Sequence, residues 1–146
     1  MKVNIKRLDP TIELPKYHTA ESAGFDIATN ADMTIGAGEI VKIPTGLVIE
    51  APEGYFLGVV ARGSTAMKTG LQMANAMGVV DRDYAGPNDE VFLPMRNFTD
   101  KPTTIKRGDR IAQGLFIKID QAEWIESDMI RNKDRGGYGS TGGYHA

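Results

Sequence analysis

Short apolar runs, broken at close intervals by Pro, Gly, Asp and Asn, constrain this chain more than any other feature of its sequence. Such runs are typical of short β-strands joined by tight turns. The runs that we interpret as strands are residues 3–8, 25–28, 33–35, 40–43, 47–50, 55–61, 78–81, 90–97, 110–119 and 124–130. This pattern predicts an all-β fold, which is a sandwich, a jelly roll or a distorted β-barrel of many short strands.

One short helix is expected among the strands. Ser64 or Thr65 would cap it and Gly70 would end it. The chain of 146 residues suits one domain, which we place at residues 1–133. The glycine-rich segment 134–146 has too few apolar side chains to hold itself in a core. We expect this segment to be a flexible C-terminal lid, although flexible C-termini are common without any function.

Composition narrows the class of partner. The formal net charge of -2 argues against a broad basic surface for nucleic acid, so an anionic small molecule is the better expectation. The absence of cysteine excludes disulfides, thiolate metal sites and cysteine nucleophiles. Residues 1–8 lack the apolar core of a signal peptide or a membrane anchor. We therefore expect a cytoplasmic protein without membrane or nucleic-acid partners.

Five segments, taken in order, resemble the five motifs of the trimeric dUTPase family. The resemblance runs from residue 23 to residue 142, and the order and spacing make it specific although each segment alone is weak. It implies a homotrimeric enzyme that uses Mg²⁺ to hydrolyse dUTP to dUMP and pyrophosphate. The segments are residues 23–28 (AGFDIA), 62–65 (RGST), 75–84 (NAMGVVDRDY), 108–113 (GDRIAQ) and 135–142 (RGGYGSTG).

The third segment carries the most chemistry. The resemblance implies that Asp81 is the general base for the water that attacks the α-phosphate, a role that contributes about 10²–10⁴ in rate. The ring of Tyr84 would pack on the deoxyribose and exclude a 2′-hydroxyl. The amide of Asn75 would pair with the uracil edge, and small residues such as Gly78 would leave no room for a methyl group at C5. Without the family context, a turn aspartate is the favoured interpretation of Asp81. A half-buried strand tyrosine is about as likely for Tyr84, and the alternative for Asn75 is a hairpin asparagine in the left-handed conformation.

The second and fourth segments would bind the phosphates. Arg62 supplies a positive charge, and the N–H groups after it would point at the anion from the start of the short helix. The family usually has a serine where Gly63 stands, and the hydroxyls here are those of Ser64 and Thr65. Gln113 resembles the phosphate-contacting glutamine of the family.

The first segment supplies the expected metal contact. Asp26 resembles an aspartate that orders the waters around Mg²⁺, an ion often held mainly by substrate phosphates. Read alone, Asp26 is equally a turn residue at a strand end. Asp109 and Arg110 are expected to form a structural pair near the start of a strand.

The fifth segment would close over the site of neighbouring subunits, which is the reason to expect a trimer with shared sites. In this interpretation Arg135 reaches the γ-phosphate and Tyr138 stacks on the uracil. Ser140 and Thr141 would hold other phosphate oxygens.

Other functions stay open. A dCTP deaminase of the same fold would activate water at C4 of cytosine, but residues 75–84 fit the pyrophosphatase better. A bifunctional enzyme, a regulatory protein such as a repressor, and a structural β-sandwich without a site are further alternatives. The turn at residues 85–90 resembles the form in some bacteriophage-type and Bacillus-type members.

Overall fold

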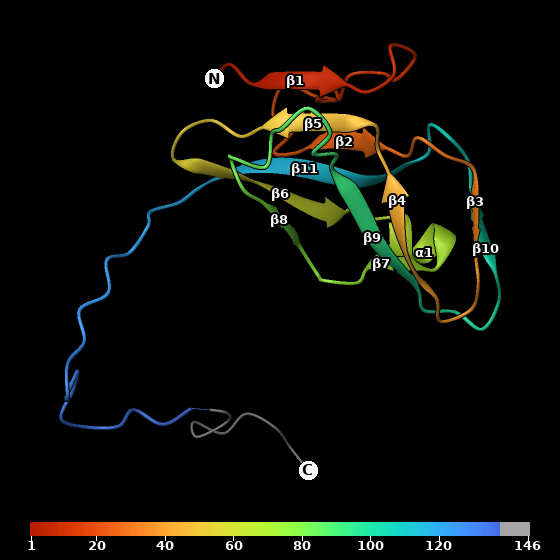
Figure 1. Ribbon diagram of the computed structural model, residues 1–146. Coiled ribbons are helices and arrows are strands. Elements are labelled where there is room, and N and C mark those ends of the chain that lie inside the picture. The colour runs from red at the N-terminus through yellow and green to blue at the C-terminus, as the bar shows by residue number, and fades with distance from the viewer. Residues whose placement is uncertain (138–146) are drawn as a thin grey trace.

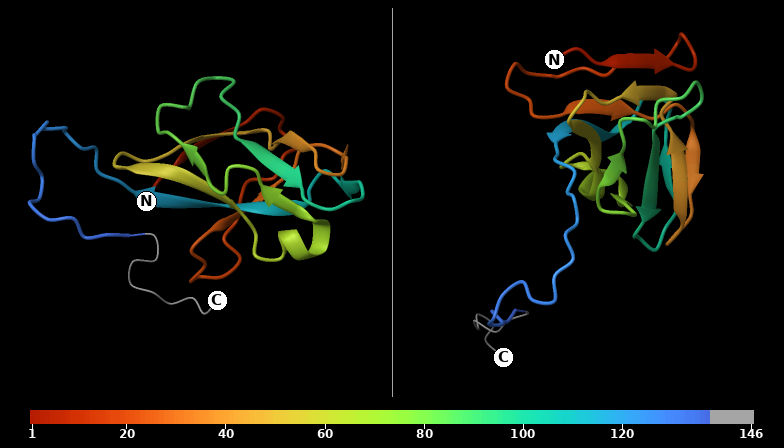
Figure 2. Two further views of the ribbon diagram at one scale, coloured as in Figure 1. Left: turned by 90° about the horizontal axis from the view of Figure 1, so that it is seen from below. Right: turned by 60° about the vertical axis from the view of Figure 1, so that its left-hand side comes forward.

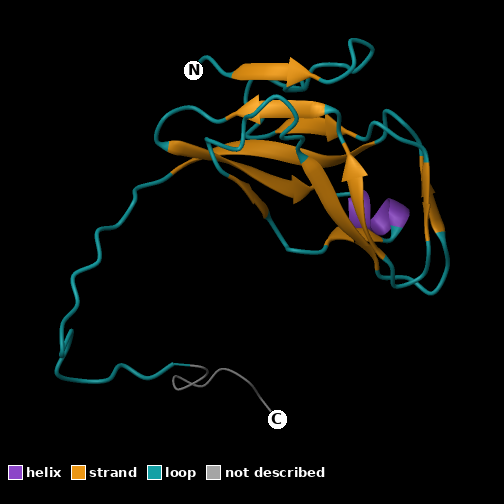
Figure 3. Ribbon diagram, viewed as in Figure 1, coloured by secondary structure: helices purple, strands orange, loops and turns teal. Residues whose placement is uncertain are grey.

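The computed structural model, which describes residues 1–137, is built almost entirely of short strands. One short helix interrupts them, as Figure 3 shows by its colouring. The elements are β1 (Asn4–Arg7), β2 (Phe25–Ala28), β3 (Met33–Ile35), β4 (Ile40–Pro44), β5 (Leu47–Glu50), β6 (Tyr55–Ala61), α1 (Thr65–Thr69), β7 (Leu71–Met73), β8 (Gly78–Val80), β9 (Phe92–Asn97), β10 (Thr103–Ile105) and β11 (Arg110–Lys118). The all-β prediction is confirmed.

The strands pair in antiparallel fashion into four small sheets that fold around one core (Figure 1). The largest sheet has the order β2-β11-β6-β8 and a second has the order β4-β9-β7. β1 pairs with β5, and β10 pairs with β3. Neighbouring strands are often distant in sequence, which is the kind of connectivity found in jelly-roll folds.

Alternating burial along the strands decides which side chains reach the core. In β2, Phe25 and Ile27 point inward and are buried, whereas Asp26 and Ala28 lie on the other face. Successive residues of a strand point to opposite faces, so this two-residue period places Asp26 outside the core. The largest side chains of the core are Ile27, Ile35, Ile43, Leu47, Ile49, Leu57, Leu71, Leu93, Met95 and Ile105.

The helix lies where it was predicted. It begins after Ser64, which makes no side-chain cap hydrogen bond, and ends at Gly70 in the left-handed conformation at φ 68°. A side chain at position 70 would be strained in this conformation. No helix among the described residues is long and apolar enough to cross a membrane.

Two of the strands, β7 and β10, were not predicted from the sequence, and one predicted strand is wrong. β7 and β10 contain three residues each, too few to show a period. Residues 124–130 form no strand, because nothing in the described chain pairs with them. Residues 118–137 are exposed throughout, and all three views in Figures 1 and 2 show them leaving the domain as an extended arm.

Candidate functional site

Asp26 is the centre of a cationic cluster. Its Oδ1 forms an ion pair with Arg62, at 2.9 Å from Nε. Its Oδ2 lies 2.8 Å from His18 Nε2 and 3.5 Å from Arg110 Nη1. The Asp26 side chain is only 11% exposed. Two arginines and a histidine around one carboxylate leave an excess of positive charge, which favours an anionic ligand.

A β-bulge brings the parts of this cluster together. The pairing of β11 with β2 shifts register between Arg110 and Ala112, so Ile111 has no partner in β2. The Ile111 carbonyl instead accepts hydrogen bonds from Arg62 N at 3.1 Å and from the Thr65 hydroxyl at 2.7 Å. The bulge therefore holds the loop after β6 against the start of β11.

The loop from Arg62 to Thr65 offers backbone donors to a ligand. Within the described residues, neither Gly63 N nor Ser64 N donates a hydrogen bond. Thr65, in contrast, has no free donor for a ligand among the described residues. It is buried, its N–H donates to Arg62 O, and its hydroxyl donates to the carbonyl of Ile111 in the bulge. The hydroxyl left for a ligand in this segment is therefore that of Ser64.

Gln113 lies beside Asp26 across the pairing of β11 with β2. Its Nε2 donates to Ala61 O at 3.4 Å, a long contact that leaves the amide able to bind elsewhere. A Cβ at Gly24 would lie 3.0 Å from Gln113 Oε1. Glycine at position 24 therefore gives the Gln113 side chain its room.

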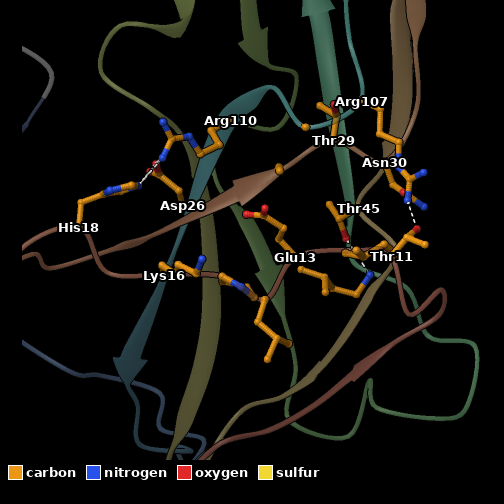
Figure 4. Close-up of a pocket in the computed structure, with 16 residues that line it drawn as sticks. Thr11, Glu13, Lys16, His18, Asp26, Thr29, Asn30, Thr45, Arg107 and Arg110 are labelled. Atoms are coloured by element: carbon orange, nitrogen blue, oxygen red, sulfur yellow. Dashed lines mark hydrogen bonds and ion pairs between the residues drawn. The ribbon is translucent and has the colours of Figure 1, made fainter.

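A cavity of about 370 Å³ adjoins the cluster. Figure 4 shows His18, Asp26 and Arg110 together at one end, with Arg107 and Thr11 at the other. The Arg107 guanidinium is held by the Thr11 hydroxyl and lies 3.7 Å from Asp9. Each end of the cavity therefore carries an arginine paired with a carboxylate, Arg110 with Asp26 at one end and Arg107 with Asp9 at the other.

The turn that connects β7 to β8, two strands of different sheets, carries the residues expected to recognise the base. Asn75 is exposed in this turn, where its carbonyl accepts Met77 N at 2.6 Å. The left-handed residue is Ala76 at φ 60°, so the alternative of a left-handed Asn75 is wrong. A non-glycine residue in this conformation is uncommon and marks backbone strain of the kind found at ligand sites. Gly78 begins β8 opposite Val59.

Asp81 and Tyr84 lie in the exposed loop that follows β8. The Asp81 carboxylate accepts no hydrogen bond from the described residues, so it does not act as the turn cap considered above. Tyr84 lies outside the strands, is 42% exposed, and donates its hydroxyl to Glu90 O at 3.2 Å. Both side chains are therefore available to a ligand.

The Asp26 cluster and the Asp81 loop do not meet within one subunit. β2 and β8 are the two edges of the sheet β2-β11-β6-β8, so about three strand spacings, or ~14 Å, separate them. They are also offset along the strands. Gln113, beside Asp26, pairs with Val60, whereas Val80 pairs with Leu57. The structure thus brings the predicted phosphate residues together and leaves the predicted base and sugar residues at another place.

The remaining predicted residues lie on the arm. Arg135 is exposed and has no ion pair among the described residues. Tyr138, Ser140 and Thr141 lie outside the described residues.

Two members of the cluster, His18 and Arg110, were not predicted from the sequence. No role was expected for His18, and Arg110 was expected to pair with Asp109. The latter expectation is wrong, because Asp109 Oδ2 accepts Lys106 N at 2.7 Å while Arg110 contacts His18 and Asp26. No local sequence pattern predicts the contact between His18 and Arg110, because the two residues lie 92 positions apart in the chain.

The described residues include no group of three or more His, Cys, Asp or Glu side chains placed to hold a metal ion. Arg62 and His18 already face the two oxygens of Asp26. This donor set does not fit a cation held by the protein alone. It fits a cation that arrives with an anionic ligand and keeps its waters.

Comparison with known proteins gives consistent matches. A family model described as dUTPase matches residues 11–142. The chain is 39% identical to the deoxyuridine 5′-triphosphate nucleotidohydrolase of Thermobifida fusca, over 100% of this chain and 82% of that protein. It is 42% identical to the protein of the same name from Desulfitobacterium hafniense, over 97% of this chain and 95% of that protein.

Solved structures share the fold. The dUTPase of Streptococcus mutans is 32% identical with a TM-score of 0.76, over 85% of this chain and 100% of that chain. The dUTPase of Staphylococcus bacteriophage 80alpha with dUPNHPP is 22% identical with a TM-score of 0.83, over 97% of this chain and 98% of that chain. At this lower identity the phage structure shows the fold alone, so a bacteriophage-type origin stays a prediction.

Proposed function

The chain belongs to the dUTPase family, and we propose that it is a dUTP diphosphatase in which an Asp81-activated water attacks the α-phosphate. The observation that carries the proposal is the presence of two complementary groups in the order of the family motifs. One is an anion-binding group around Arg62 and Asp26. The other is an accessible carboxylate at Asp81 next to an exposed Tyr84.

The proposed reaction is an in-line displacement. Asp81 accepts a proton from water while the water oxygen bonds to the α-phosphorus, and the bond from this phosphorus to the bridging oxygen breaks with its electron pair on pyrophosphate. Arg62, Gln113 and the N–H groups of Gly63 and Ser64, which donate to no acceptor in the described part of the chain, stabilise the negative charge that develops. No residue becomes covalently attached.

The turn between β7 and β8 is proposed to recognise the nucleoside. The exposed amide of Asn75 offers a donor and an acceptor, which suit the N3–H and O4 of uracil. The close backbone turn at Ala76 and Gly78 would exclude a 5-methyl group. Tyr84 presents an exposed ring that would pack on deoxyribose and exclude a 2′-hydroxyl. These contacts would select dUTP over dCTP, dTTP and UTP.

Mg²⁺ is the proposed cofactor, held by the triphosphate. When bound, it would neutralise phosphate charge. Asp26 would contact its waters, since a carboxylate oxygen accepts more than one hydrogen bond and the side chain keeps some exposure.

A homotrimer with shared sites is part of the proposal. Because Asp81 and the Asp26 cluster lie on opposite edges of one sheet, a single dUTP needs the two groups from different subunits. The arm also exposes apolar side chains that a lone subunit cannot bury, namely Trp124 at 91%, Ile125 at 88% and Ile130 at 91%. Contact with a neighbour would cover them.

The end of the arm is the proposed lid. Arg135 would reach the γ-phosphate, Tyr138 would stack on uracil, and Ser140 and Thr141 would bind phosphate oxygens. We also propose a cytoplasmic location, where nucleotide triphosphates are made and used.

The test is pyrophosphate release from dUTP, dCTP, dTTP and UTP, with and without Mg²⁺, for the wild type and Asp81→Asn. We expect release from dUTP only, and a loss of about 10²–10⁴ in the variant at unchanged thermal stability. Ammonia release from dCTP would favour the deaminase instead. A folded wild type that releases pyrophosphate from no nucleotide would contradict the proposal.

A further inference from the structure

The Nε2 atom of His18 has two competing neighbours. It lies 2.8 Å from Asp26 Oδ2 and 2.5 Å from Arg110 Nη1. A ring nitrogen of histidine either carries a proton and donates, or has a lone pair and accepts. His18 Nε2 can therefore bond the carboxylate or the guanidinium, but not both.

The structure holds the arrangement in which Arg110 donates to His18. In this arrangement Asp26 Oδ2 is sealed from solvent and has no hydrogen-bond partner among residues 1–137. A buried carboxylate oxygen without a donor is unfavourable. The imidazole that could supply the donor is already within reach.

The second arrangement gives Asp26 Oδ2 the donor that it lacks. With the proton on Nε2, His18 donates to Oδ2, which lies 2.8 Å away, while Oδ1 keeps its ion pair with Arg62. The N–H of His18 then repels the Arg110 donors, so the guanidinium must leave His18. The Arg110 side chain is 48% exposed and lines the cavity with His18 and Asp26 (Figure 4), so it has room to move.

We propose that His18 is a positioning residue that, by donating to Asp26, frees Arg110 to bind a phosphate of the triphosphate. This inference rests on the proposed function for the identity of the anion. Substrate favours the second arrangement because only that arrangement presents Arg110, and a ligand shifts an equilibrium by its differential affinity for the two states. Arg110 thereby joins Arg62 as a cationic phosphate contact.

The experiment measures the Kd of the non-hydrolysable α,β-imido analogue of dUTP by calorimetry, together with kcat and KM for dUTP. We expect about tenfold weaker binding and a similar rise in KM for His18→Ala, since hydrogen bonds to charged groups are worth about one factor of ten or more. kcat should change little. His18→Gln places an amide donor near the position of Nε2 and should restore most of the affinity.

Two controls distinguish a role of His18 through Arg110 from a general effect of removing a side chain near the cavity. Lys16→Ala removes a charge from the same segment and cavity lining, at a side chain without a contact to Asp26 among the described residues. It should leave Kd unchanged. In an Arg110→Ala background, His18→Ala should have no further effect, because His18 acts through Arg110.

Three results would each overturn the inference: wild-type affinity in His18→Ala, equal losses in His18→Ala and His18→Gln, or an undiminished effect of His18→Ala in the Arg110→Ala background. Inorganic triphosphate, used as a second probe, tests anion binding without the nucleoside. A wild type that binds triphosphate in a His18-dependent way but hydrolyses no dUTP would refute the proposed function alone.

Discussion

Mixing two inactive variants should restore activity if each site takes Asp81 from one subunit and Arg62 from another. The variants are Asp81→Asn, which removes the base, and Arg62→Ala, which removes a phosphate contact. Each alone should be nearly inactive. Co-refolding them from denaturant at equal amounts forms mixed trimers in which some sites receive both wild-type residues.

The expected recovery follows from the geometry. Arg62 follows β6, and its side chain reaches Asp26 of β2, whereas Asp81 follows β8 at the opposite edge of the four-stranded sheet. The two edges are ~14 Å apart. A base must lie within about 3 Å of the proton it takes, or reach it through one water. With subunits drawn at random and each site built from two of them, about a quarter of the sites are intact. Pyrophosphate release should therefore reach about one quarter of the wild-type rate.

A mixture that stays at the level of its two components would refute this reasoning, since a site within one subunit always lacks one of the two residues. The matched control is a mixture of Asp81→Asn with the double variant Asp81→Asn/Arg62→Ala. This mixture contains no wild-type Asp81. It should therefore show no recovery of activity, whether the site is shared between subunits or lies within one subunit.

Two further predictions concern the support of the fold. Thr65→Val removes the buried hydroxyl that bonds the Ile111 carbonyl at 2.7 Å, so the free energy of unfolding in urea should fall by about 1–2 kcal/mol. Thr103→Val, at a strand threonine whose hydroxyl makes no hydrogen bond among the described residues, should change it by at most about 0.5 kcal/mol, and equal values for the two would contradict the assignment. The Arg107 backbone N–H, helped by the Lys106 side chain, lowers the pKa of Asp32. A lowered pKa in the folded state gives stability that is present at neutral pH and lost as pH falls through that pKa. Asp32→Asn should therefore flatten the loss of thermal stability below about pH 4, and an unchanged acid limb would count against this contact.

Local patterns made the strands predictable. Runs such as Phe25–Ala28 and Leu47–Glu50 combine β-branched or aromatic residues with clear turn signals on both sides. β7 and β10 are too short for a period to show. Residues 124–130 have the composition of a strand, but a strand also needs a partner, and composition cannot say whether one subunit supplies it.

The site was predictable in its residue types but not in its contacts. The motif order identified Asp26, Arg62 and Gln113, and the structure places all three together. His18 and Arg110 were missed as cluster members because their contact joins segments 92 residues apart. The bulge at Ile111, which no local pattern announces, turns the start of β11 toward β2. The separation of Asp81 from the cluster likewise depends on strand order, a property of the whole sheet.

The central claim is that water attacks the α-phosphorus of dUTP, and hydrolysis in ¹⁸O-labelled water tests it most directly. Attack at the α-phosphorus places one ¹⁸O atom in dUMP and none in pyrophosphate, as read by mass spectrometry of the products after a single turnover. Label found in pyrophosphate would place the attack on the β-phosphorus and contradict the role assigned to Asp81.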